Sequence, residues 1–217
     1  VALILLLVIF GTINPIYVSP SNLVDIINQA TIYGMMGLGM TFIIISGGID
    51  LSVGSAFALV GVVVAKLAVA GVPAVLVILI GLALGFLLGC VNGFLISKLS
   101  LQPFVATMGT MSIFRGIAYV VTDGKPVLSV PKTFRRTVDG LIIGDIRISI
   151  IIFLVAAVIL GILLKETEFG NSVYAIGGNE EAARLSGIKT TLNKVLIYGV
   201  GMMGTAMAAI IQIGKLG

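Results

Sequence analysis

Long apolar runs alternate with short polar breaks along the whole sequence. Several of these runs approach the roughly 20 residues that an α-helix needs to cross the hydrocarbon core of a bilayer. We therefore expect an all-α, polytopic membrane helix bundle that forms a single transmembrane domain over residues 1–217. The pattern predicts about seven spans, the first of them cut at its start: residues 1–13, 23–46, 51–70, 74–97, 103–121, 148–164 and 195–213.

One polar break interrupts apolar sequence at residues 46–55, which read SGGIDLSVGS. Gly47 and Gly48 can end one helix, and Asp50 can cap a second helix that begins near Leu51. Non-helical backbone at membrane depth survives only where protein or a water-filled cavity covers it. Asp50 is therefore either an N-cap in a tight turn or part of a broken helix that lines a polar path, and both descriptions can hold together.

Small and polar residues mark further positions within the spans. Four glycines repeat at intervals of four residues and predict a face on which a neighbouring helix packs closely: Gly81, Gly85, Gly89 and Gly93. We expect Arg115 to face the bundle interior, in a pathway or in a buried ion pair, because a charge in lipid is costly. The candidates for a translocation path are Ser46, Asp50, Ser52, Ser55, Asn92, Thr107, Thr110 and Arg115.

A polar loop at residues 168–188, EFGNSVYAIGGNEEAARLSGI, contains a complete miniature helix. Asn179 is a good N-cap, and two acidic residues follow it in the first turn, where the helix dipole favours negative charge. Glu180 and Arg184 stand at i and i+4, and Gly187 provides a left-handed stop. Helices below about 12–15 residues are marginal alone in water. The segment is therefore either an interfacial helix on its own protein or a docking element for a partner.

A second loop spans residues 122–147, and its alternating stretch at 141–148 predicts a short strand or an amphipathic surface segment. The basic residues of all the loops divide six against five between the two sides of the membrane. The positive-inside rule therefore does not fix the orientation of the chain.

Composition excludes several classes of function. The chain is 59% hydrophobic and 10% charged, so it is not a soluble globular domain. Basic loops around membrane helices account for its net charge of +4, and no basic patch interleaved with aromatics indicates nucleic-acid binding. The sequence has no histidine and a single cysteine, Cys90, so we expect no catalytic residue, no metal site and no disulfide.

Three blocks of the chain resemble one family, in the order that the family shows: SGGIDLSVGS at 46–55, LSLQPFVATMGTMSIFRG with a downstream GKP at 99–126, and FGNSVYAIGGNEEAARLSGI at 169–188. This family comprises the permease subunits of bacterial ABC sugar importers, in the branch that handles ribose, xylose, arabinose and galactosides. The resemblance implies a multi-pass protein of the bacterial cytoplasmic (inner) membrane. It also implies further C-terminal helices, because full-length relatives continue with a block of the type YELDAIAAVVIGGTSLxGG.

In this family the 168–188 loop is cytoplasmic and docks on the ATPase subunit. The implied partners are an ABC ATPase, a periplasmic or lipid-anchored sugar-binding protein, a second permease copy and the lipid bilayer. ATP and Mg²⁺ belong to the ATPase, because this chain contains no G-x-x-x-x-G-K-[ST] phosphate cradle. The implied ATPase-coupling residues are Phe169, Gly170, Tyr174, Ala175, Gly177, Gly178, Asn179, Glu180, Glu181, Ala182, Ala183, Arg184, Leu185, Ser186 and Gly187.

Two other classes of function compete with an importer permease. A secondary, ion-coupled transporter would use a broken helix such as that at residues 47–50 and a membrane cation such as Arg115. That hypothesis leaves the capped helix at 180–186 without a purpose. An intramembrane enzyme would lack a histidine base and a second membrane carboxylate beside Asp50. Co-purification with an ATPase subunit would separate the importer from both alternatives.

Overall fold

The computed structural model describes residues 2–143 and 146–216, and most of these residues are helical. Proline at the first helical position, which tolerates its missing N–H group, begins both α2 and α5. The elements are α1 (Ala2–Ile13), a 3₁₀ helix η1 (Pro15–Val18), α2 (Pro20–Ile45), α3 (Val53–Val69), α4 (Ala74–Ser97), α5 (Pro103–Thr122), α6 (Lys132–Asp139), β1 (Leu141–Ile143), β2 (Ile146–Arg147), α7 (Ile148–Glu166), α8 (Glu168–Gly178), α9 (Glu180–Leu185) and α10 (Thr190–Leu216).

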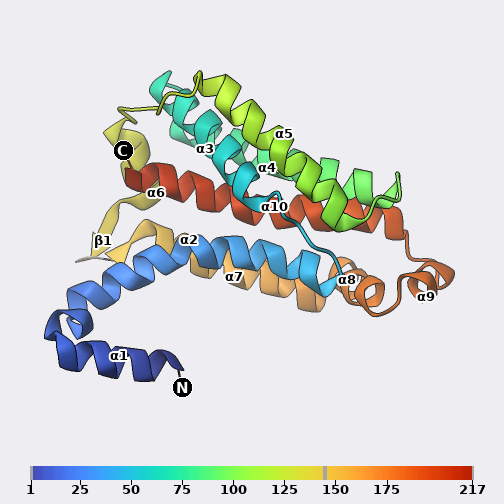
Figure 1. The fold of residues 1–217 in the computed structure, drawn as a ribbon, viewed down its shortest axis with the longest axis horizontal. Helices are drawn as coiled ribbons and strands as arrows, with labels where there is room; N and C mark the ends of the chain where they lie inside the picture. The colour runs from blue at the N-terminus through green and yellow to red at the C-terminus, as the bar shows by residue number, and fades with distance from the viewer. Residues whose placement is uncertain (1, 144–145, 217) are drawn as a thin grey trace.

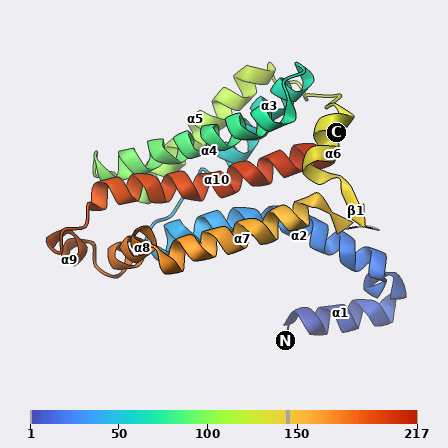
Figure 2. The ribbon, with the colours of Figure 1, turned by 180° about the vertical axis from the view of Figure 1, so that it is seen from behind.

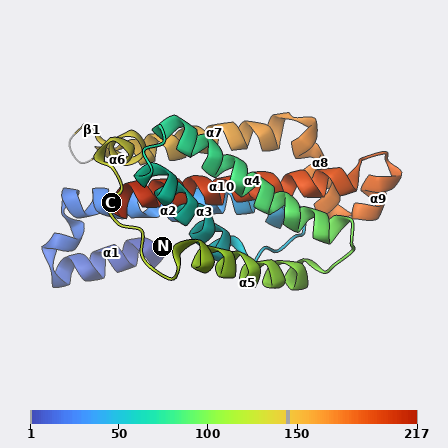
Figure 3. The same ribbon diagram turned by 90° about the horizontal axis from the view of Figure 1, so that it is seen from above.

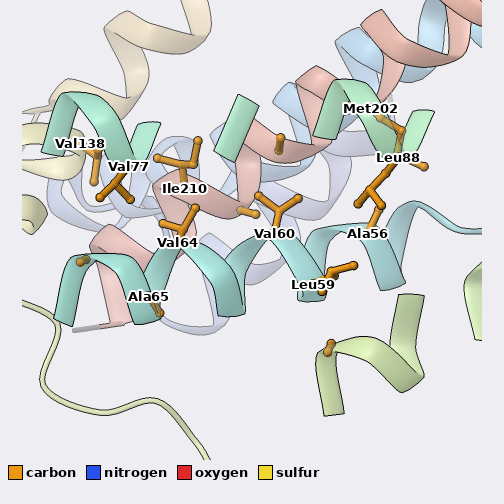
Figure 4. Packing of buried hydrophobic residues seen from close by; sticks show 14 of the residues in the cluster. Ala56, Leu59, Val60, Val64, Ala65, Val77, Leu88, Val138, Met202 and Ile210 are labelled. Carbon is orange, nitrogen blue, oxygen red and sulfur yellow. The ribbon is translucent and has the colours of Figure 1, made fainter. Parts of the chain in front are cut away.

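The longest helix, α10, is the centre of the bundle. It runs between a group formed by α3, α4 and α5 and a second group formed by α2 and α7 (Figures 1 and 2). Viewed from above, α4 lies along α10, while α5 and α7 lie on opposite sides of it (Figure 3). The main core cluster joins α10 to its neighbours through Met202 and Ile210, which pack with Val64 and Val77 (Figure 4).

The four glycines of α4 face α10. A Cβ at Gly81 would meet the side chains of Val64 and Ile210, and one at Gly85 would meet Ala206. A Cβ at Gly89 would overlap the carbonyl oxygen of Tyr198, and Gly93 is similarly close to the backbone of α10. The absence of side chains along this face therefore lets the two helices approach backbone to backbone.

The structure supports an all-α membrane bundle, but it does not confirm a count of seven spans. Among the described residues, four helices are long and apolar enough to cross a membrane, namely α4, α5, α7 and α10. Helix α3 is apolar but has only 17 residues, because the break before it uses residues that would otherwise lengthen it. Helix α2 has 26 residues, but its first turns are polar.

Two helices lie in segments that the apolar pattern assigns to loops. The long loop at 122–147 contains α6, followed by a short antiparallel pair in which Leu141 faces Arg147. Of the two structures predicted for 141–148, the described residues therefore form short strands. The first half of the 168–188 loop forms α8, whose N-cap Thr167 accepts a hydrogen bond from the backbone of Gly170. Helix α10 also begins at Thr190, earlier than the apolar pattern predicts.

Candidate functional site

The break between α2 and α3 occupies residues 46–52 and runs as an irregular connection from the end of α2 near α8 to the start of α3 (Figure 1). Gly47 ends α2 with a φ of 77°, in the left-handed region that favours glycine. Helix α3 begins at Val53, and its N-cap is Ser52. The predicted capping role of Asp50 for a helix starting near Leu51 is therefore wrong.

Asp50 instead forms the centre of a buried hydrogen-bond network. Its Oδ1 accepts hydrogen bonds from the backbone N–H of Ser52 at 2.8 Å and from Ser52 Oγ at 2.7 Å. Its Oδ2 accepts one from Asn92 Nδ2 of α4 at 3.0 Å, and the same nitrogen lies 2.8 Å from Ser52 Oγ. Both carboxylate oxygens are thus satisfied, as a buried charge requires.

Two further helices hold the backbone of the break. The N–H of Leu51 donates to Thr107 Oγ1 of α5 at 3.1 Å, and Tyr198 Oη of α10 donates to the carbonyl oxygen of Ile49 at 3.2 Å. Thr107 lies one turn, about 6 Å, from the start of α5, and Tyr198 lies about 12 Å from the start of α10. Neighbouring helices therefore hold the buried part of the break, near the end of the bundle that carries α8 and α9, while Gly47, Ile49 and Leu51 remain exposed in this chain.

The structure brings only part of the predicted translocation path together. Asp50, Ser52, Asn92 and Thr107 share the network, whereas Ser46, Ser55 and Thr110 are buried nearby but take no part in it. Arg115 is exposed on the outer face of α5, so the expectation that it faces the interior of this chain is wrong. Helix α5 buries the neighbouring residue, Phe114, and consecutive residues on a helix point about 100° apart.

The network makes a prediction that a simple N-cap would not. An N-cap accepts asparagine nearly as well as aspartate. In the network, however, Asp50→Asn places one NH₂ group against the NH₂ group of Asn92, or leaves a Ser52 donor unpaired. We expect this variant to lose about 1–3 kcal/mol of stability.

The exchange of both residues, Asp50→Asn with Asn92→Asp, restores a donor facing an acceptor and should recover part of the loss. Thermal unfolding in detergent measures both, and equal stability of Asp50→Asn and wild type would contradict the network.

The short helix α9 has the caps that its sequence predicts. Asn179 Oδ1 accepts a hydrogen bond from the N–H of Ala182 at 2.9 Å. Gly187 has a φ of 89°, and the N–H of Ile188 donates to the carbonyl oxygen of Ala183 at 3.1 Å, which closes the C-terminal end. Helix α9 lies at the end of the molecule, beyond the bundle (Figure 1).

The ion pairs of α9 differ from the predicted i,i+4 pair. Arg184 pairs with Glu181 at 2.7 Å, one turn earlier on the exposed surface. The hydrogen bond from Arg184 to Glu181, together with the carboxylate charge, raises the pKa of the guanidinium above its usual value. Glu180 pairs instead with Lys194 of α10 at 2.5 Å. This second pair ties α9 to the central helix, and no local sequence pattern indicates it.

Helix α8 contacts the end of α2 directly before the break. A Cβ at Gly177 would overlap the carbonyl oxygen of Ile45, the last residue of α2. The ring of Phe169 stacks on Phe42 of α2, with centroids 6.1 Å apart and planes 22° from parallel. Phe169 lies five residues before Tyr174 in the sequence, and nothing local indicates that its partner is Phe42.

The predicted coupling residues divide into an inner and an outer set. Gly170 and Ala183 are buried, while Phe169 and Ala175 are partly buried in the cluster that includes Phe42. Leu185 is 80% exposed, an unusual position for a large apolar side chain in a polar loop. The other exposed members are Tyr174, Gly177, Gly178, Asn179, Glu180, Glu181, Ala182, Arg184, Ser186 and Gly187.

A bundle of long apolar helices with a hydrogen-bonded polar break and a capped helix outside it has the architecture of a polytopic membrane protein. Residues 22–217 match a family model described as "Branched-chain amino acid transport system / permease component". The chain belongs to this family of import permeases and is a multi-pass protein of the bacterial inner membrane. Members of the family are transport components, so the intramembrane enzyme is set aside, and the similarity to import permeases favours the importer over an ion-coupled transporter.

Curated relatives fall in the sugar branch of the family. The ribose import permease protein RbsC of Bacillus subtilis (strain 168) is 43% identical over 99% of this chain and 67% of its own length. The D-allose transport system permease protein AlsC of Escherichia coli (strain K12) is 35% identical over 99% and 66%. The galactose/methyl galactoside import permease protein MglC of Salmonella typhimurium is 34% identical over 100% and 70%. No solved structure matches the chain.

Proposed function

We propose that this chain forms the translocation path of an ATP-driven importer for a ribose-like monosaccharide, and that α8 and α9 transmit movement from a separate ATPase subunit to the break at residues 46–52. The similarity to ribose, allose and galactoside permeases supports the substrate class. The observation that carries the coupling role is that one loop contacts both α2, which leads into the break, and α10, which holds the backbone of the break.

Two contacts between the loop and the bundle provide mechanical connections. Gly177 of α8 abuts the carbonyl oxygen of Ile45, one residue before the break. Glu180 of α9 pairs with Lys194 of α10, one turn before Tyr198, which holds the carbonyl oxygen of Ile49 within the break. A rigid displacement of α8 and α9 therefore acts on the break from α2 and from α10 together.

The outer surface of α9 has the composition of a docking site. Leu185 is exposed beside the Glu181–Arg184 pair, so an apolar side chain is flanked by charges that can fix an orientation. The ATPase subunit of the importer is the proposed occupant, and it would hold ATP and Mg²⁺.

Two further partners complete the proposal. Helix α5 exposes Arg115 together with Gly109, Ser112 and Gly116, and a charge on a membrane helix favours a protein or aqueous neighbour over lipid. A second permease copy is the proposed neighbour of this face. A periplasmic or lipid-anchored sugar-binding protein would dock at the end of the bundle opposite α9.

The docking role is tested by reversing the charges of α9. The double variant Glu181→Lys, Arg184→Glu keeps an ion pair within the helix but inverts the pattern that a partner meets. We expect membrane insertion to be unchanged, ATPase binding to fall about tenfold or more, and sugar uptake to be lost. Pull-down of the ATPase in detergent and sugar uptake in cells measure these effects.

The matched control exchanges Lys165 and Glu166, a neighbouring exposed ion pair outside α8 and α9. The variant Lys165→Glu, Glu166→Lys has the same net charge and should bind the ATPase as wild type does. Wild-type ATPase binding and uptake by the α9 variant would show that α9 is an interfacial helix without a docking role.

A further inference from the structure

The end of the bundle opposite α9 carries a basic cavity of about 550 Å³. It lies where α6 and the hairpin β1–β2 meet the C-terminal end of α10, and Figures 1 and 2 show α6 beside that end. No contact proposed for the ATPase loop reaches this part of the molecule. The cavity is lined by Lys132, Arg135, Arg136, Asp139, Gly140, Leu141, Arg147 and Gly214.

The cations in this cavity exceed the acids that could neutralise them. Asp139, the one acidic residue among the described lining residues, is buried, and each of its carboxylate oxygens already has a partner. Its Oδ2 pairs with Arg147 at 2.9 Å, and its Oδ1 accepts a hydrogen bond from Ser149 Oγ at 2.6 Å.

Three cations remain after this pairing. Within the described part of the chain, no carboxylate forms an ion pair with Lys132, Arg135 or Arg136. Arg135 donates from Nε to the carbonyl oxygen of Gly214 at 3.5 Å, which leaves its terminal nitrogens for another acceptor. The cavity therefore has the charge and the donors to hold an anion such as a phosphate group.

The cavity also lies at the level of a membrane surface. Arg147 is the N-cap of α7, whose apolar residues are partly or fully exposed within this chain, so the hydrocarbon boundary falls near this position. Helix α6 is amphipathic: it buries Phe134 and Val138 against the bundle and directs Lys132 and Arg136 outward. This arrangement is typical of a helix that lies in the plane of the interface.

Exposed apolar side chains adjoin the cations. On the hairpin, Leu141 is 63% exposed, Ile142 45% and Ile146 44%, and they lead into the exposed apolar surface of α7. A soluble acidic partner would match the charges alone and would make no use of the adjoining apolar surface. An anionic phospholipid matches both, with its phosphate among the cations and its acyl chains along the hairpin and α7.

We propose that Lys132, Arg135 and Arg136 form a binding site for the phosphate of an anionic phospholipid headgroup, with Leu141, Ile142 and Ile146 contacting its acyl chains. The site is independent of the ATPase contact, and it fastens the α6–β1–β2 segment to one leaflet. Phosphatidylglycerol is the appropriate probe, and phosphatidylcholine, which carries no net charge, is the comparison lipid.

The test uses the permease produced at its natural full length and purified in mixed phosphatidylglycerol–phosphatidylcholine nanodiscs. Native mass spectrometry after release counts the retained lipids. We expect wild type to retain phosphatidylglycerol preferentially and Lys132→Gln, Arg136→Gln to retain about tenfold less of it. The matched control Lys98→Gln, Lys165→Gln removes two exposed lysines outside the cavity and should retain lipid as wild type does.

Three outcomes would overturn the proposal. The first is that wild type retains no more phosphatidylglycerol than phosphatidylcholine, and the second is that the control variant loses as much retained phosphatidylglycerol as the cavity variant. The third is that inorganic phosphate occupies the site as well as the lipid does. Loss of binding to a sugar-binding protein with unchanged lipid retention would instead assign the cavity to a protein partner and would also overturn it. ATPase pull-down with the same variant should stay at the wild-type level, which separates this test from that of the coupling role.

Discussion

Replacing Gly89 by leucine is expected to eliminate folded permease from the membrane fraction. A Cβ at this position would overlap the carbonyl oxygen of Tyr198, which belongs to the backbone of the central helix and cannot rotate away. Even Gly89→Ala must separate α4 from α10 along the face they share, and overpacking of this kind costs about 1–3 kcal/mol, occasionally more. The yield of monodisperse protein from membranes measures the effect.

Gly161→Leu is the matched control. Gly161 lies in α7, is exposed, and has open space around the position of a Cβ in the described structure. Leucine there faces lipid and removes a flexible glycine from a helix, so the yield should equal or exceed that of wild type. If Gly89→Leu accumulated as well as Gly161→Leu, close packing of α4 on α10 would not be what holds this bundle together.

Replacing Gly177 by alanine is expected to uncouple ATP hydrolysis from transport. The added Cβ would overlap the carbonyl oxygen of Ile45 and push α8 away from the end of α2. The outer surface of α9 is unchanged, so the ATPase should still bind. The connection from α8 to the break is displaced, however, so sugar uptake should fall by about tenfold or more while the ATPase remains associated. Uptake in cells, together with pull-down of the ATPase, measures both effects.

Its neighbour provides the control. Gly178 follows Gly177 and is the last residue of α8, but a Cβ there would have no atom of the described structure within 4 Å. Gly178→Ala changes the chain by the same methyl group and should transport as wild type does. Equal defects in the two variants would mean that the flexibility of this glycine pair matters, and not the contact with Ile45.

Local sequence signals predicted the local structure well. The caps of α9 depend on residues within nine positions of each other, and the structure forms them at Asn179 and Gly187. The glycines of α4 likewise share one face because helical periodicity alone places them there. Neither feature requires knowledge of which helices are neighbours.

Long-range partners could not be predicted in the same way. Asp50 is a reasonable N-cap by its neighbours in sequence, yet Asn92, 42 residues away, determines how its carboxylate is used. Glu180 has Arg184 within reach along α9, but the packing of α9 beside α10 gives it Lys194 instead. For Asp50 the tertiary contact adds to the local hydrogen bonds from Ser52, whereas for Glu180 it replaces a local ion pair of similar chemistry.

The second limit on prediction concerned which surfaces of a membrane helix are buried. A charged residue in an apolar span predicts a protein or aqueous environment, and for Arg115 we expected that environment inside this chain. Its exposure on α5 moves the expectation to a surface between chains, which a single sequence cannot identify. Helix α8 was missed for a different reason: its apolar residues are too few to stand out beside the spans, although Thr167 followed by Glu168 supplies a start signal.

The central claim, that the loop formed by α8 and α9 drives the break at residues 46–52, is tested most directly by the amount of sugar imported per ATP hydrolysed. The measurement uses proteoliposomes containing the full-length permease, its ATPase and its sugar-binding protein. We expect Gly177→Ala to hydrolyse ATP while importing far less sugar per ATP than wild type and Gly178→Ala. A ratio for Gly177→Ala equal to that of wild type would contradict the claim.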